Sequence, residues 1–382
     1  MLVRAMTGKE IFKEHFFRIR YDFLDDTQQI KEESSVGYSC VKNGLLYSSL
    51  EEAENKAEQK LRVQLVKNNL YQVAYTLFQE ICSISEVTVK IFEPVASLQY
   101  IEINGLNDWR FTGYIRVALS VKKTGEIYWD FFDVNEKSWE INVLAWAHEI
   151  IRYSSLPIFE TANLNDMVLD SGKPGVIFHE IGHLLECDNI KKDALHSFPS
   201  NFSVVDNPLL RQYNGSYSVD DNGNIAKKTA VIDSGKIVSS IGTYDAYDCS
   251  ITTCGRRMNY SSLPLPRMSV TFLDSGDYSP ADIISGVDNG VFVKSIVNSY
   301  AIPKTGIINF CNGVTYPING GIVDTNYRCV ERNNRVPLYG LLGGIKEVGN
   351  DLRIVMGRGL CNKKGQEIVC SYGTPTTHIM LE

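Results

Sequence analysis

The chain has 382 residues, of which 44% are hydrophobic, and a formal net charge of −7. This length is sufficient for two or three packed modules, and the hydrophobic content is typical of a globular protein. The acidic balance, without a basic tail or an arginine-rich patch, argues against a nucleic-acid partner. No run of about eighteen apolar residues indicates a membrane span.

The cysteine content indicates the redox compartment. Nine cysteines are scattered along the chain, an odd number without any C-x-x-C pair. The first twenty residues carry charges throughout and contain no apolar stretch typical of a signal peptide. We therefore expect reduced thiols and a cytoplasmic location, so that a thiol is available as a metal ligand.

The first part of the chain is predicted to contain strands followed by helices. Residues 15–23 and 34–49 alternate apolar and polar side chains, and Asn43-Gly44 is a hairpin turn signal. Residues 49–66 and 71–85 have the pattern of two helices. Together they predict an N-terminal α/β module over residues 1–85.

A second α/β module is predicted over residues 86–164. Strand-like segments occupy residues 87–92, 113–123 and 126–134, and the last two are separated by a turn at Thr124-Gly125. Residues 138–155 then carry apolar side chains at helical spacing.

The remainder, residues 165–382, is predicted to be a β-rich domain with one prominent helix. A short strand over residues 165–170 leads into a helix over residues 176–187, which Pro174 opens. Three later turns have the composition of hairpin loops, at residues 221–223, 233–235 and 319–321. The predicted fold class is therefore α+β, with N-terminal α/β modules followed by a β-rich C-terminal domain that carries a metal-binding helix.

The metal prediction rests on the motif His179-Glu180-x-x-His183 in this helix. A helix turns 100° per residue, so the two histidines lie on one face and can reach the same ion. Glu180 is then placed to take a proton from a metal-bound water, as in the H-E-x-x-H zinc hydrolases. Gly182 between the ligands allows a substrate or another strand to come close.

The alternative to a metal site is a buried helix with two satisfied histidines. The helix is apolar elsewhere, but histidine is scarce in this chain, and burying two histidines and a glutamate without a shared task is costly. A catalytic site also needs a third protein ligand. Local spacing leaves several candidates open: Glu186, Asp188, His196, His378 and any of the thiols.

Several longer segments resemble one family, the TldD/PmbA metallopeptidases, also called modulators of DNA gyrase. Residues 165–188 look like the strand, turn and metal helix of its active subunit. Residues 204–208 and 218–240 are similar to its run of hairpins. CGRRMNYSSLPLPRM, at 254–268, is similar to its G-R-R…P-x-P-R-M signature, and residues 349–366 look like its closing segment. The resemblance covers residues 165–382 firmly and the preceding part more weakly.

The resemblance implies a particular set of site residues. It makes His179, His183 and Cys361 the ligands of a Zn²⁺ ion, with Glu180 as the general base. Cys361 stands in a C-x-x-x-G-Q context, which its rival Cys370 does not share. The family motif is typically one residue longer, H-E-x-x-x-H, so the spacing in this chain is that of an ordinary helix.

The resemblance also implies an activity and a partner. The family hydrolyses unstructured peptides, in maturation or degradation, as a homodimer or as a heterodimer of TldD with a TldE-like subunit that lacks the metal. A metal-dependent amide or C–N bond-cleaving enzyme for a small molecule is the first alternative, and a non-catalytic partner subunit is the second. An intact Glu180 argues against the second, because a structural metal needs no base.

Four further residues of the signature segment have open roles. Arg256, Arg257 and Arg267 could bind a peptide C-terminus or an oxyanion, but we favour a structural role in fixing the surrounding loop. Tyr260 is a weaker candidate for an oxyanion donor.

Overall fold

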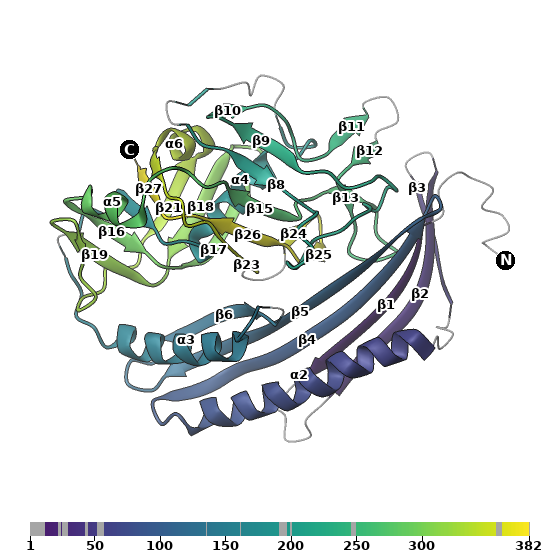
Figure 1. Ribbon diagram of the computed structural model, residues 1–382, viewed down its shortest axis with the longest axis horizontal. Helices are drawn as coiled ribbons and strands as arrows, with labels where there is room; N and C mark the ends of the chain where they lie inside the picture. Colours follow the sequence, from purple (N-terminus) through teal and green to yellow (C-terminus); the bar gives the residue numbers. More distant parts are fainter. Residues whose placement is uncertain are drawn as a thin grey trace.

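The computed structural model describes residues 12–21, 24, 30–42, 45–51, 57–134, 136–160, 162–190, 197–198, 201–245, 250–356 and 361–381. Two layers make up the N-terminal part, a long antiparallel sheet and two helices on one of its faces. The strand-rich C-terminal part lies on the opposite face (Figure 1). The structure confirms the predicted α+β class.

The N-terminal sheet has six strands in the order β3-β2-β1-β4-β5-β6. They are β1 (Phe12–Tyr21), β2 (Ile30–Lys42), β3 (Leu45–Glu51), β4 (Val87–Ile103), β5 (Leu106–Val121) and β6 (Ile127–Asp133). The sheet thus combines strands from both predicted N-terminal modules, and the division of the chain into three domains stays a prediction. The predicted turn at Asn43-Gly44 lies outside the described residues.

The longest hairpin of this sheet joins β4 and β5 through Asn104 and Gly105. Both residues have positive φ, 52° and 77°, which an Asn-Gly pair adopts readily. Because the two strands pair over their whole length, this hairpin extends far beyond the strands predicted at residues 87–92 and 113–123.

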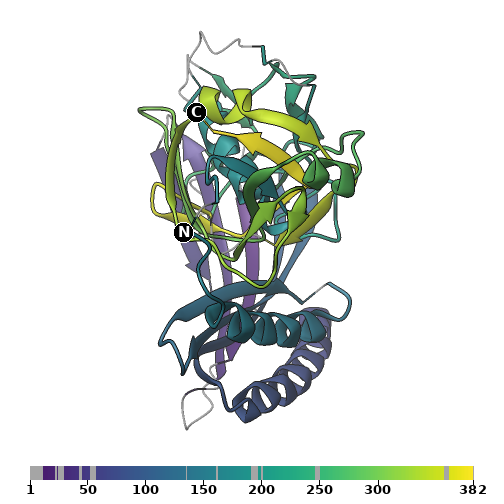
Figure 2. The ribbon, with the colours of Figure 1, turned by 90° about the vertical axis from the view of Figure 1, so that its left-hand side faces the viewer.

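Two helices cover the face of this sheet that is turned away from the C-terminal part (Figure 2). They are α2 (Ala57–Ser83) and α3 (Trp139–Ser154). Helix α3 forms where it is predicted, and its apolar side chains at helical spacing are buried against the sheet. The two helices predicted at residues 49–66 and 71–85 are instead one continuous helix, and residues 49–51 belong to β3.

Two six-stranded sheets form the frame of the C-terminal part, in the orders β10-β9-β8-β15-β26-β23 and β20-β19-β16-β7-β27-β22. The first contains β8 (Val204–Asp206), β9 (Thr229–Asp233), β10 (Lys236–Ile237), β15 (Val270–Leu273), β23 (Arg353–Met356) and β26 (Ser371–Thr374). The second contains β7 (Asp166–Leu169), β16 (Asn289–Val293), β19 (Thr315–Asn319), β20 (Ile322–Val323), β22 (Ile345–Val348) and β27 (Thr377–Met380).

Smaller elements complete this part. A three-stranded sheet has the order β17-β18-β21, and three two-stranded ladders are present in the described chain. These strands are β11 (Thr243–Asp245), β12 (Ser250–Thr253), β13 (Gly255–Arg256), β14 (Leu265–Pro266), β17 (Ile296–Ile302), β18 (Ile307–Asn312), β21 (Asn333–Pro337), β24 (Cys361–Lys363) and β25 (Gln366–Ile368). The helices are η1 (Lys173–Gly175), α4 (Val176–Leu184), α5 (Pro280–Ser285) and α6 (Leu338–Gly343). All three predicted hairpin turns connect paired strands or bridges.

Helix α4 lies in the middle of this arrangement, and its apolar side chains share one core with both six-stranded sheets. Two glycines let other segments approach it closely. A Cβ atom on Gly175 would lie 2.4 Å from the backbone of Gly373 in β26, and one on Gly182 would lie 2.1 Å from Sδ of Met268. The close approach predicted at Gly182 is therefore made by Met268.

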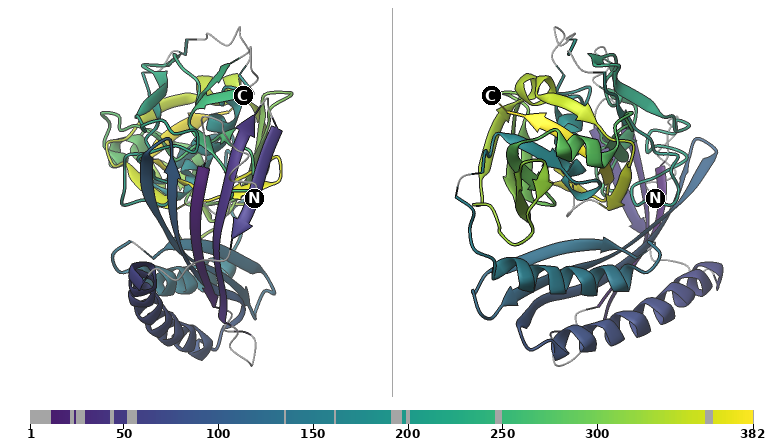
Figure 3. Two further views of the ribbon diagram at one scale, coloured as in Figure 1. Left: turned by 90° about the vertical axis from the view of Figure 1, so that its right-hand side faces the viewer. Right: turned by 60° about the vertical axis from the view of Figure 1, so that its left-hand side comes forward.

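The N-terminal sheet and the C-terminal part lie side by side (Figure 3), and buried polar contacts join them. Nη1 of Arg110 in β5 lies 2.7 Å from Oδ1 of Asp221, and the side chain of Asn214 exchanges two hydrogen bonds with the backbone of Gly113. These groups are buried, so the two parts are held in a defined relation to each other.

Candidate metal centre

Helix α4 places His179 and His183 one turn apart on the same face. Their ring centroids are 4.9 Å apart and the ring planes are nearly perpendicular, at 87°. His179 is 6% exposed, and the side chain of His183 is 15% exposed. Both imidazoles therefore lie in a largely dry environment.

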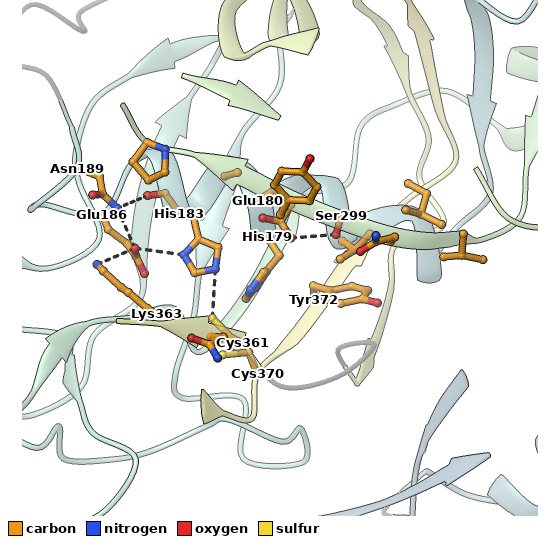
Figure 4. A pocket seen from close by; sticks show the side chains of 18 of the residues that line it. His179, Glu180, His183, Glu186, Asn189, Ser299, Cys361, Lys363, Cys370 and Tyr372 are labelled. Atoms are coloured by element: carbon orange, nitrogen blue, oxygen red, sulfur yellow. Dashed lines mark hydrogen bonds and ion pairs between the residues drawn. The ribbon is translucent and has the colours of Figure 1, made fainter. Parts of the chain in front are cut away.

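Cys361, the first residue of β24, lies directly opposite this face of the helix (Figure 4). Its Sγ atom is 3.2 Å from Nε2 of His183. One potential ligand atom from each of His179, His183 and Cys361 lies within 4.8 Å of the other two, and no other such group of three or more exists in the described part of the chain. The structure thus brings together the three residues that the resemblance implied.

The donor chemistry of these residues fits a zinc ion. Nδ1 of His179 is buried and has no hydrogen-bond partner among the described residues, so this ring is not held by the protein on that side. Two imidazoles and a thiolate are a usual ligand set for Zn²⁺, and such a set leaves a fourth position for water or substrate.

The surroundings of Cys361 favour the thiolate form that binds metals. Burial alone raises the pKa of this thiol, but a hydrogen bond with Cys370 and the positive charge of His183 outweigh burial, so its pKa lies well below the usual value. Burial likewise lowers the pKa of His183, yet Cys361 and Glu186 outweigh it and raise that pKa well above the usual value. Each of the two groups therefore favours the charged form of the other.

Arg267 holds Cys361 from the other side. Its guanidinium is fully buried, and Nη2 donates to the carbonyl oxygen of Cys361 and to its Sγ atom at 3.0 Å. Nη1 donates to the carbonyl oxygen of Gln366 in the next strand, 3.1 Å away. One side chain therefore fixes the β24–β25 hairpin and its thiolate together.

Glu180 is buried next to the two histidines, and its carboxylate faces the cavity. Oγ of Ser299 in β17 donates to Oε1 of Glu180 at 2.9 Å, as the dashed line in Figure 4 shows. The hydrogen bond fixes the rotamer of this carboxylate at the wall of the cavity.

A cavity of about 480 Å³ opens onto these residues. One wall is strand β17, and all residues from Ile296 to Ala301 line the cavity. Tyr372, Trp129 from β6 and the β24 hairpin form other parts of the lining. Among the described strands, β17 pairs with β18, and no other described strand pairs with it.

The other third-ligand candidates have different surroundings. Glu186 contacts Nδ1 of His183, on the side of the ring away from Cys361. Asp188 pairs with Lys363 and Lys364. His378 pairs with Asp166 on the sheet that contains β7 and β27, and His196 lies outside the described residues. Cys370 lines the cavity and touches Cys361, but it is not part of the three-ligand group.

The remaining arginines of the signature segment mostly donate to the backbone. Arg256 donates to the carbonyl oxygens of Met268 and Val369, and Arg257 donates to the carbonyl oxygen of Asp221 and to Oγ of Ser39. Both line a second cavity with Tyr260, between the N-terminal sheet and the C-terminal part, and not the cavity at His179. Their contacts favour the structural role.

Sequence reasoning missed Ser299 and Lys363. Ser299 stands in a strand without a motif, and only the fold brings it to Glu180. Lys363, two residues after Cys361, carries a buried ammonium group that contacts Glu186 at 2.8 Å. The sequence did contain a signal for Lys363. A positive charge stands next to Cys361, and two negative charges, Glu186 and Asp188, follow His183, so these charges can pair if Cys361 and His183 meet.

Comparisons with known proteins agree with the fold and indicate a metallopeptidase class. The family model described as PmbA/TldA metallopeptidase C-terminal domain matches residues 166–380. The chain therefore belongs to the TldD/PmbA metallopeptidase family.

Two relatives illustrate the extent of the similarity. A protein of Buchnera aphidicola subsp. Acyrthosiphon pisum, named metalloprotease TldD homolog, is 31% identical over 265 residues, which are 64% of this chain and 54% of that protein. A zinc metalloprotease TldD homolog of Saccharolobus solfataricus is 24% identical over 213 residues, 53% of this chain and 47% of that protein. The chain spans about half the length of the curated relatives it matches.

The overall fold is shared with solved structures. TldE from Thermococcus kodakarensis superimposes with a TM-score of 0.66 at 13% identity, covering 97% of this chain and 96% of that one. The similarity is therefore one of fold. Among the described residues, none of the helices has the length and apolar character required to span a membrane.

Proposed function

We propose that this chain is a zinc-dependent metallopeptidase of the TldD type, which hydrolyses unstructured peptides in maturation or degradation. The observation that carries this proposal is the meeting of His179, His183 and Cys361 beside the carboxylate of Glu180. Relatives named metalloproteases, one of them a zinc metalloprotease, support the assignment.

In this proposal the two histidines and Cys361 hold the zinc ion. A bound zinc ion supplies Lewis acidity, and it lowers the pKa of a coordinated water molecule to about 7. Glu180 accepts a proton from water in the cavity and later returns it to the leaving amine. Ser299 keeps the carboxylate turned towards that position through its hydrogen bond to Oε1.

The shape of the cavity supports an extended peptide as the substrate. Residues Val297 to Ala301 of β17 line the cavity beside Glu180, and among the described strands only β18 pairs with this strand. A peptide that adds to a strand edge is recognised through its main chain, largely independently of sequence. An unstructured segment can take up the extended conformation that this pairing needs, which supports an unstructured peptide as the substrate.

A subunit partner completes the proposal. The chain shares its fold with TldE of Thermococcus kodakarensis, and we propose that it acts as a dimer, either with a second copy or with a TldE-like subunit. A non-catalytic role would leave the ordered Glu180–Ser299 pair without a purpose, so we assign this chain to the catalytic type.

Incubation of the zinc-loaded chain with unfolded peptides, followed by mass spectrometry, tests the proposal. New peptide termini that disappear with a chelator and return with Zn²⁺ are expected. Cleavage of small amides without any cleavage of peptides would favour the small-molecule alternative. A chain that binds zinc but yields no product with either substrate, alone or with a TldE-like subunit, would contradict a catalytic role.

A further inference from the structure

Glu186 and Lys363 form a buried ion pair directly behind the candidate metal centre. Glu186 follows the end of helix α4, and its carboxylate is fully buried. Lys363 ends β24, two residues after Cys361, and is 8% exposed. Nζ of Lys363 lies 2.8 Å from Oε2 of Glu186, as Figure 4 shows.

The same carboxylate oxygen contacts a ligand histidine. Oε2 of Glu186 lies 3.2 Å from Nδ1 of His183, whereas Nε2 of that ring faces Cys361. An Nδ1–H group that donates to Glu186 leaves Nε2 with its lone pair directed towards the metal position. In metal sites, a carboxylate in this place fixes both the tautomer and the ring orientation of the ligand histidine.

The ammonium group of Lys363 is fully used by the protein. Its three donors reach Oε2 of Glu186, Oδ1 of Asp188 at 2.6 Å and the carbonyl oxygen of Pro266 at 3.1 Å. Glu186 and Asp188, which follow α4, thus bind the strand that carries the thiolate through Lys363. The side chain therefore joins the two sequence segments that supply the ligands.

A buried ion pair has a high desolvation free energy, so packing alone does not explain why one joins these two elements. Removing both charges from water carries a large desolvation cost, and well-packed apolar residues of similar volume often join two elements at least as well. The Glu186–Lys363 pair does something that an apolar pair cannot do, because its carboxylate also accepts from Nδ1 of His183.

We propose that Glu186 and Lys363 act as one positioning unit, the clasp, which orients His183 and holds the Cys361 strand at ligand distance. This inference rests on the proposed metal centre but adds residues to it. Neither residue is a ligand or a catalytic residue. Glu186 acts through His183, and Lys363 acts through Glu186 and the position of the β24–β25 hairpin.

The test compares metal binding by the full chain and four variants: Glu186→Gln, Lys363→Met, the double variant, and Glu14→Gln. Glu14 is a matched control, because its carboxylate is also buried and hydrogen-bonded but lies in β1, far from the ligands in sequence. Zinc affinity is measured by competition with a chromophoric chelator. The Co²⁺-loaded proteins report ligand geometry through their visible bands and thiolate ligation through the sulfur-to-cobalt charge-transfer band.

We expect Glu186→Gln and Lys363→Met each to weaken zinc binding about 10–100-fold. The double variant should bind about as weakly as the poorer single variant, because both changes break the same unit. The visible Co²⁺ bands should shift in Glu186→Gln, and the charge-transfer band should weaken in Lys363→Met. Glu14→Gln should match the parent in both measurements.

Parent-like affinity and spectra in both single variants would overturn the clasp while leaving the proposed function intact. If the loss of zinc affinity in the double variant equals the product of the two single losses, Glu186 and Lys363 do not act as one unit, and the clasp is overturned. A parent chain that binds no metal would overturn the proposed function and the clasp together. If one single variant fails to fold, the double variant replaces it, because it leaves neither partner of the pair buried alone. Parent-like zinc affinity and Co²⁺ spectra in the double variant would then overturn the clasp, and weakened binding with shifted spectra would support it.

Discussion

The Sγ atom of Cys361 lies 3.2 Å from Nε2 of His183, although 178 residues separate the two in the sequence. The helix that carries the histidines and the hairpin that carries the cysteine share a single hydrophobic core. The candidate centre therefore exists only when the whole C-terminal part is folded. Arg267 and Lys363 hold the hairpin in place from two sides.

Replacement of Glu180 by Gln should abolish most hydrolysis while leaving metal binding intact. The amide cannot accept the proton, and general-base catalysis typically contributes on the order of 10²–10⁴-fold in rate. Ser299→Ala removes a hydrogen bond to a charged carboxylate, worth about 1.5–3 kcal/mol, and should cost about 10–100-fold in rate. Steady-state peptide cleavage together with zinc content measures both effects. Full activity in Glu180→Gln would show that another group is the base.

The two glycines beside helix α4 should respond differently to alanine. At Gly182 the added Cβ meets the side chain of Met268, whereas at Gly175 it meets the backbone of Gly373 in β26. Gly182→Ala should therefore cost about 1–3 kcal/mol of unfolding free energy, and Gly175→Ala should lie at the upper end of this range or beyond.

A double-mutant cycle in urea denaturation checks this explanation. The variant with both Gly182→Ala and Met268→Ala should be more stable than the sum of the two single changes predicts, because the shortened side chain makes room for the new Cβ. Strict additivity would contradict the contact between Gly182 and Met268.

We compare two ion pairs between the N-terminal and C-terminal parts, and we expect the loss of Arg110 to lower the unfolding free energy more than the loss of Arg353. Removal of Arg110 takes a cation away from the buried carboxylates of Asp108 and Asp221, and breaking a buried pair from one side typically costs about 3–5 kcal/mol. The pair of Arg353 and Glu136 is half exposed and serves as the control, with an expected cost below about 1 kcal/mol.

The unfolding free energies of Arg110→Met and Arg353→Met compare these pairs directly. Comparable losses in both variants would show that the buried contacts do not hold the two parts together. A loss confined to Arg110→Met would support the interface as a rigid junction.

Much of the fold could be predicted from local patterns. Helix α3 and the hairpin turns follow from side-chain periodicity and from Asn-Gly or Asp-x-Gly signals, which act over a few residues. The long β4–β5 hairpin was underestimated, although Asn104-Gly105 is a strong turn signal, because its strands mix polar and apolar residues on both faces. Helix α2 runs through the segment where an interruption was predicted.

The residues of the candidate site that lie on helix α4 could be predicted from the sequence more readily than those that other segments contribute. His179, Glu180 and His183 follow from helical geometry alone. The position of Cys361 depends on long-range packing, so local spacing left the third ligand open, and only the family resemblance indicated it. Ser299 and Lys363 reach the site through tertiary structure, and their roles could be read only from the folded chain.

The zinc content of the purified parent, Cys361→Ser and Cys370→Ser tests the central claim most directly. We predict about one zinc ion per chain in the parent and in Cys370→Ser, and loss of the metal in Cys361→Ser, because a serine hydroxyl is a poor zinc ligand beside two imidazoles. Retention of a full equivalent of zinc in Cys361→Ser, or its loss in Cys370→Ser alone, would contradict the assembly of this centre from helix α4 and Cys361.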